Sequence, residues 1–119
     1  MTTPLVETER FKEGLARLDA DLMAARALLE AQVARVWHNP ERATAKDRSR
    51  MADQLQAVVW ITAACVRVAE GCFELAGSGA VYESSSLQRR VRDLRVTQHM
   101  AAHPRNYVFA GDAVLARLS

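Results

Sequence analysis

The residues best suited to chemistry gather in one short stretch near the end of the sequence. His99 and His103 are four residues apart, a helical spacing at which two imidazoles can share a metal ion. No acidic residue lies between them as in a metalloprotease motif, and the remaining histidine, His38, falls in a predicted linker, so we expect no metal site. A surface histidine is the simplest interpretation of His99, and an acid or base is the functional one.

Arginines cluster in the same stretch. Four of them meet a single aspartate between Gln88 and Arg95, and the planar guanidinium fork suits phosphate or carboxylate groups. We nevertheless expect a structural ion pair between Arg89 and Asp93, which are four residues apart. The alternative is that Arg92 or Arg95 holds a phosphate or carboxylate. With His99 as the candidate catalytic residue, the candidate contacts to a substrate or cofactor are Arg92, Arg95, Gln98 and His103.

Hydrophobic periodicity predicts the elements that position these side chains. An apolar residue recurs every three or four positions in the first part of the chain, at Leu15, Leu18, Leu22, Ala25, Leu29, Val33 and Val36. This spacing predicts a long amphipathic helix. Similar patterns, with proline and glycine breaks, predict helices over about 8–37, 46–76, 85–102 and 105–117. In the third, Leu87, Val91, Leu94, Gln98 and Ala101 are expected to form the packing stripe.

The second predicted helix differs from the others because the run Ala57–Val66 is apolar almost all round. Such a helix packs on more than one side, either in the centre of a bundle or at a subunit interface. Thr44 with Asp47 resembles an N-terminal cap for it, and Gly77 is expected to end it in a left-handed conformation. Serines 84–86 are cap candidates for the next helix.

No strand signal or repeat interrupts this helical pattern. Four helices with short connections predict an all-α protein, an antiparallel up-down four-helix bundle formed by one domain over residues 1–119.

Composition excludes several classes of protein. The net charge of +2 comes from interspersed acidic and basic side chains, which argues against nucleic-acid binding. No long apolar run or leader-like N-terminus is present, so we expect a cytoplasmic protein without a membrane span. Cys65 and Cys72 lie about 10 Å apart along one predicted helix, too far for a disulfide.

One arrangement of residues is typical of a known family. It comprises paired glycines, a tyrosine, a Ser-x-Leu-x-Arg start and an Arg-Asp-x-Arg motif, here Gly77, Gly79, Tyr82, Ser85, Leu87, Arg89 and Arg92-Asp93-Leu94-Arg95. From about Leu15 to Leu115 the chain resembles the C-terminal helical domain of acyl-CoA-dehydrogenase-like flavoproteins. The pair Gln98-His99, with Tyr107 and Gly111 downstream, is similar to the branch of two-component flavin-dependent monooxygenases.

The resemblance covers one of the three domains that such enzymes usually have. It implies that the domain holding most of the flavin is missing, so FAD or FMN would bind tightly only together with a partner chain. The catalytic glutamate of the dehydrogenases falls at Ala101, which cannot accept a proton. His99 matches the histidine near the reactive edge of the flavin in the monooxygenase-like branch.

Three hypotheses for the function follow. The first is a stand-alone or split subunit that completes a flavin-dependent oxidoreductase site with a flavoprotein partner. In related enzymes this domain builds the oligomer core, so a dimer or higher homo-oligomer is implied. The second is a non-catalytic helical interaction module. The third is a cofactor-free cyclase or isomerase that uses a pocket between helices, with His99 as acid or base.

Overall fold

The described part of the chain is entirely helical. The computed structural model describes residues 4–38, 40, 48–77 and 85–119, and no strand occurs within them. It comprises a short 3-10 helix η1 (Leu5–Glu7) and the α-helices α1 (Glu9–His38), α2 (Arg48–Ala76), α4 (Ser85–Met100) and α5 (Asn106–Leu118). The predicted all-α fold class is confirmed.

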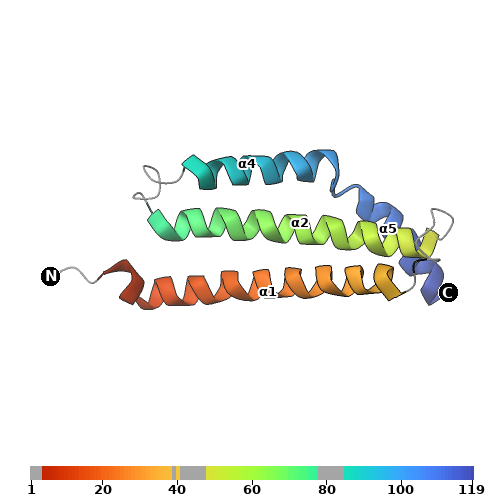
Figure 1. Ribbon diagram of the computed structural model, residues 1–119, viewed down its shortest axis with the longest axis horizontal. Helices are drawn as coiled ribbons and strands as arrows, with labels where there is room; N and C mark the ends of the chain where they lie inside the picture. Colours follow the sequence, from red (N-terminus) through yellow and green to blue (C-terminus); the bar gives the residue numbers. More distant parts are fainter. Residues whose placement is uncertain (1–3, 39, 41–47, 78–84) are drawn as a thin grey trace.

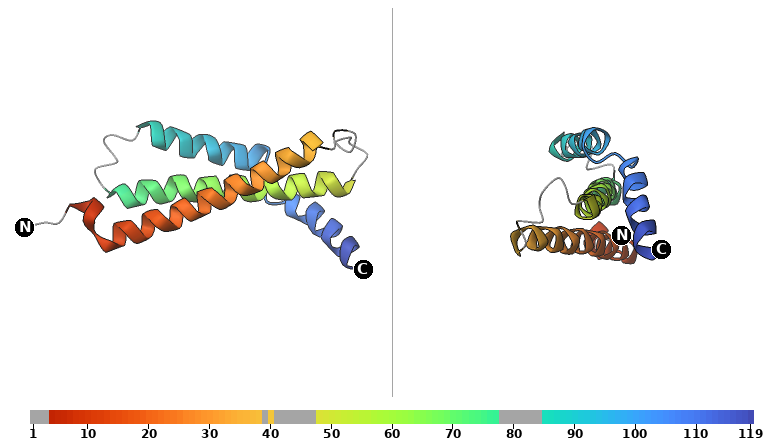
Figure 2. Two further views of the ribbon diagram at one scale, coloured as in Figure 1. Left: turned by 60° about the horizontal axis from the view of Figure 1, so that its bottom comes forward. Right: turned by 90° about the vertical axis from the view of Figure 1, so that its right-hand side faces the viewer.

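The three long helices lie side by side, and their chain directions alternate (Figure 1). Helix α2 lies in the middle and packs against α1, α4 and α5. The end-on view in Figure 2 shows α5 crossing one side of this row. The molecule is accordingly elongated, with extents of 63 × 27 × 26 Å. Helix α5 therefore covers one end of α2 and leaves other surfaces of the row open.

The covered side of α1 is not the apolar stripe that periodicity predicts. Leu18 is half-buried and Ala25 is buried as expected, but Leu29 and Val33 are exposed. The residues with the least exposure instead recur at a mean interval of 3.5 residues, which is the repeat of two helices packed along each other. They are Phe11, Gly14, Leu18, Asp21, Ala25, Leu28 and Gln32. In the second half of α1, the exposed apolar residues Leu29 and Val33 therefore each follow directly after a half-buried residue, Leu28 or Gln32.

Small residues fill the core and allow the helices to approach each other. Among the residues whose burial the structure describes, the buried apolar ones are two valines, Val59 and Val66, and six alanines: Ala25, Ala52, Ala57, Ala64, Ala102 and Ala110. Five of the eight lie on α2. The all-round apolar character of this helix therefore matches its central position, one of the two alternatives predicted from the sequence.

Two glycines make the contact between α1 and α2 close at one end. A Cβ atom on Gly14 would lie 2.7 Å from Leu75 Cδ1, and one on Gly71 would overlap the methyl groups of Leu18. Each leucine thus occupies the space that a side chain would take on the facing helix. These glycines position the helix pair, and sequence periodicity did not identify them.

The helix ends have identifiable causes. The backbone N–H of Phe11 donates a hydrogen bond of 3.2 Å to Thr8 Oγ1, which caps the start of α1. Gly77 has a φ of 74° after the end of α2, which confirms the predicted left-handed stop. The predicted caps at Thr44 with Asp47 and at Ser84 lie outside the described residues, as do Gly79 and Tyr82.

Helix α4 ends in a wide turn. The backbone N–H groups of Ala101 and Ala102 both donate to the carbonyl oxygen of Thr97, at 2.8 and 3.0 Å. This turn buries Ala102 completely and leaves Ala101 exposed. Ala101 therefore does not extend the packing stripe as expected, because the wide turn buries the next residue, Ala102, in its place.

Candidate functional site

The predicted site residues lie along the surface of α4 and the turn that follows it. Arg92, Arg95 and His99 are exposed, and Gln98 and His103 are half-buried. The spacing of three and four residues from 92 to 99 brings the exposed side chains onto one face of the helix, as predicted. We call this surface, formed by Arg92, Arg95, Gln98, His99 and His103, the α4 face.

Arg95 ties the α4 face to the central helix. Its Nη2 forms an ion pair with Glu70 Oε1 of α2. Both residues line a cleft of about 460 Å³ between the two helices, together with Phe73, Glu74, Gln88 and Val91. The charge of Arg95 is therefore already engaged by a carboxylate, and Arg92 has no ion pair within the described residues.

The two histidines of this face contact each other. Their ring centroids are 5.8 Å apart, in an edge-on arrangement with an interplanar angle of 63°. Nδ1 of His103 accepts a hydrogen bond of 3.0 Å from the backbone N–H of Arg105. In this geometry a neutral His103 carries its proton on Nε2.

The ion pair expected between Arg89 and Asp93 is not formed, so that prediction is wrong. Both side chains are exposed to solvent, where a single pair contributes little to stability and its geometry is weakly enforced. The backbone oxygen of Asp93 accepts a hydrogen bond of 3.0 Å from Thr97 Oγ1.

The α4 face is open. Of its five residues, Arg95 alone lines any of the main clefts found in the described part of the chain. His99 and Arg92 therefore point from a helix surface, and a second surface would be needed to enclose a ligand against them.

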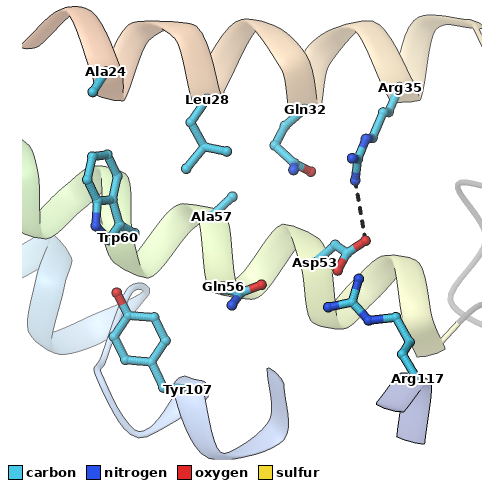
Figure 3. Close-up of a pocket in the computed structure, with 10 residues that line it drawn as sticks. All are labelled: Ala24, Leu28, Gln32, Arg35, Asp53, Gln56, Ala57, Trp60, Tyr107 and Arg117. Carbon is cyan, nitrogen blue, oxygen red and sulfur yellow. Dashed lines mark hydrogen bonds and ion pairs between the residues drawn. The ribbon is translucent and has the colours of Figure 1, made fainter. Parts of the chain in front are cut away.

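A separate cleft of about 510 Å³ lies between α1, α2 and α5 (Figure 3). We call it the interhelical cleft. Its lining residues are Ala24, Leu28, Gln32, Arg35, Asp53, Gln56, Ala57, Trp60, Tyr107 and Arg117. A volume of this size is typical of small-molecule sites.

One end of the interhelical cleft is charged. Nη1 of Arg35 lies 3.3 Å from Oδ2 of Asp53 and forms an ion pair with it. The guanidinium of Arg117, from α5, lines the cleft as well and is directed toward this end of it (Figure 3). The amides of Gln32 and Gln56 lie farther along, one on each wall.

The other end of the interhelical cleft is apolar and aromatic. Trp60 and Tyr107 lie there, opposite Ala24 and Leu28 of α1 (Figure 3). The guanidinium of Arg67 lies 5.8 Å from the centroid of the Trp60 ring, within the range of a cation–π contact. Sequence reasoning missed this cleft because its walls come from three helices that are distant in the chain.

A second concave surface, the apolar groove, runs along the other side of the α1–α2 contact. It has a volume of about 390 Å³ and is lined mainly by Leu29, Val33, Val36, Trp37, Val58 and Ile61. Five of these side chains are exposed: Val36 at 39%, Val58 at 45%, Leu29 at 50%, Val33 at 57% and Trp37 at 80%. Exposed apolar surface that is concentrated in this way commonly marks an interaction site.

The described part of the chain has neither a cluster of metal ligands nor a membrane-spanning helix. No group of three or more His, Cys, Asp or Glu residues there is arranged to hold a metal ion. None of its helices has the length and apolar character needed to cross a membrane. Cys65 and Cys72 are free thiols.

Comparison with known proteins identifies one relationship. Residues 1–104 match the family model described as the C-terminal domain of acyl-CoA dehydrogenase. The match spans all of α1, α2 and α4 and therefore includes the α4 face. Neither curated proteins nor solved structures gave a match to the chain.

Proposed function

This chain belongs to the family of acyl-CoA dehydrogenase C-terminal domains, and we propose that it acts as the helical part of a flavoprotein assembly. In this proposal the α4 face meets a partner chain that binds the flavin, and the site forms between the two. The observation that carries the proposal is the exposure of Arg92 and His99 on an open helix surface. Such a surface can supply one wall of a site.

The residues of the α4 face fit one side of a flavin and do not enclose it. Arg92 offers a cationic hydrogen-bond donor without a competing ion pair in the described residues, and His99, seven residues further along the same face, offers a donor or acceptor. A bound FAD or FMN supplies the redox chemistry. In the proposal Arg92 binds an anionic group of the cofactor or substrate, while His99 positions a proton or a hydrogen-bonding group at its edge.

Ala101 favours monooxygenase-like chemistry over abstraction of a substrate α-proton. It stands where the resemblance places the catalytic glutamate of the dehydrogenases, and its methyl group cannot act as a base. The nearest titratable groups in sequence are His99 and His103, which contact each other. A proton transfer on this surface would therefore use an imidazole.

Self-association forms the second part of the proposal. Domains of this family commonly build the oligomer core, and the apolar groove supplies a suitable surface for a dimer or a higher homo-oligomer. Burial of Val33, Trp37 and Val58 against another chain would remove a large apolar area from water.

The test is reconstitution with a candidate partner, a flavoprotein that lacks its own helical C-terminal domain, compared with the chain alone. The isolated protein is expected to lose added FAD or FMN on gel filtration, whereas the complex keeps flavin and turns over. His99→Ala and Arg92→Ala should preserve the complex and abolish turnover, and Arg89→Ala on the same helix serves as the matched control. Stoichiometric flavin on the isolated chain, or full activity in both site variants, would contradict the proposal.

One observation favours the non-catalytic alternative. Arg95, a candidate for ligand contact, is held by Glu70 in a contact that fastens α4 to α2. If Arg92 and His99 are also dispensable for turnover, the chain is an interaction module whose α4 face is structural. The same reconstitution experiment separates the two functions, because an interaction module still forms the complex.

A further inference from the structure

We propose that the interhelical cleft is a binding site for a small monocarboxylate with a flat aromatic body. The proposal concerns a surface that shares no residue with the α4 face. It is therefore independent of the flavin partner, and it goes beyond the proposed function.

The charge of the polar end favours an anion. Two guanidiniums, Arg35 and Arg117, line this end with one carboxylate, that of Asp53. Asp53 pairs with Arg35, and within the described residues Arg117 has neither an ion pair nor a side-chain hydrogen bond. A ligand carboxylate can accept two parallel hydrogen bonds from the free guanidinium fork.

The same arrangement disfavours more highly charged ligands. A phosphate monoester carries nearly two negative charges, and it would lie beside the carboxylate of Asp53 with a single unpaired arginine to compensate it. A monocarboxylate balances the one excess positive charge of this end. The charge count thus selects the class of anion.

The walls of the cleft select the body of the ligand. The rings of Trp60 and Tyr107 form one apolar end, and small residues, Ala24 and Ala57, leave room against them. Aromatic side chains prefer stacked or edge-on contact with a flat partner. Leu28 is seven residues from Arg35 on α1, about 10 Å along the axis, which suits an acid with fused rings.

Two amides between these ends can recognise polar substituents. Gln32 projects from α1 and Gln56 from α2, so each wall contributes a group that can donate and accept hydrogen bonds. They add specificity along the edge of the ligand, whereas Arg117 sets its orientation.

Binding of naphthoate and of naphthamide to the purified chain tests this proposal, because the two probes share a body and differ in charge. Calorimetric titration should show naphthoate binding at least about tenfold tighter than naphthamide, as expected for a charged hydrogen bond. Arg117→Gln should reduce naphthoate affinity to that of the amide, and Trp60→Leu should weaken both probes. Arg26→Gln, which removes an exposed charge from α1 outside the cleft, should change neither.

Three outcomes would overturn the site. They are equal affinity for the two probes, no binding of naphthoate, and unchanged naphthoate binding in Arg117→Gln. Arg117 is exposed near the end of α5, so its replacement should leave the fold intact, which circular dichroism checks. Arg117→Lys provides a further measure, since it keeps the charge, loses the fork and should restore part of the affinity. None of these measurements requires a flavin or a partner chain.

Discussion

The interhelical cleft and the apolar groove flank the same helix pair, yet their chemistry is opposite. Leu28 and Arg35 of α1 line the cleft, the residues that follow them, Leu29 and Val36, line the groove, and Gln32 borders both. One step along an α-helix rotates the side chain by about 100°. A shift of one position is therefore enough to separate a polar site from a docking surface.

The two surfaces differ because helix α5 contributes to one of them and not to the other. Helix α5 closes the cleft and brings Tyr107 and Arg117 to it, whereas α1 and α2 alone line the groove. A polar wall can remain wet or hold a small ligand. An exposed apolar wall gains most from contact with another protein surface.

The largest effect is expected from a charge placed in the groove. If the proposed homo-oligomer forms through the groove, Val58→Asp should weaken its association by about 2 to 4 kcal/mol, because an unpaired carboxylate would be buried at the docking surface. Light scattering measures the change. Trp60 and Val66, from the same apolar helix, would not serve for this test, since Trp60 lines the cleft and Val66 is 6% exposed.

Gln56→Asp is the matched control, because it introduces the same charge two positions away on the cleft side of α2. It should leave the oligomer intact. A wild-type monomer at tens of micromolar, or equal dissociation by the two variants, would remove the distinction between the surfaces.

A second test loosens the helix pair that carries both surfaces. Gly71→Ala should destabilise the fold by about 1 to 3 kcal/mol, because the added methyl group overlaps Leu18 on α1. Gly111→Ala, on α5, meets nothing within 4 Å and should stabilise by about 0.5 to 1 kcal/mol through helix propensity. Denaturant melts compare them, and stabilisation by both would show that α1 can move aside.

A smaller effect on stability is expected when the ion pair of the cleft is removed. Asp53→Asn breaks the exposed pair with Arg35 and should cost about 0.2 to 1 kcal/mol of stability. It also frees a second guanidinium, so naphthoate should bind more tightly than to the wild type. Weaker binding would mean that Asp53 orients the site and does not compete for it.

The smallest change in stability is expected outside this helix pair, on the α4 face. His99 is exposed, so His99→Ala should alter the free energy of unfolding by less than about 0.5 kcal/mol. Thermal melts measured beside the turnover of the reconstituted complex test this. A destabilised variant with full turnover would assign His99 a structural role.

Sequence patterns predicted the helices and the position of α2 because both depend on local periodicity. They failed at Leu29 and Val33, since an apolar stripe does not specify which part of it a neighbouring helix covers. The shared face of Arg92 and His99 was predictable from helical spacing within one element. The interhelical cleft was not, because Arg35, Asp53 and Arg117 meet only through tertiary packing.

The central position of α2 also bears on how the protein opens. Helices α1 and α4 lie on opposite sides of α2, and each packs mainly against it (Figure 1). Either outer helix can detach while the other stays in place, so their amide hydrogens should exchange with solvent through separate partial openings. Amides in the middle of α2 lose protection only when the whole domain unfolds.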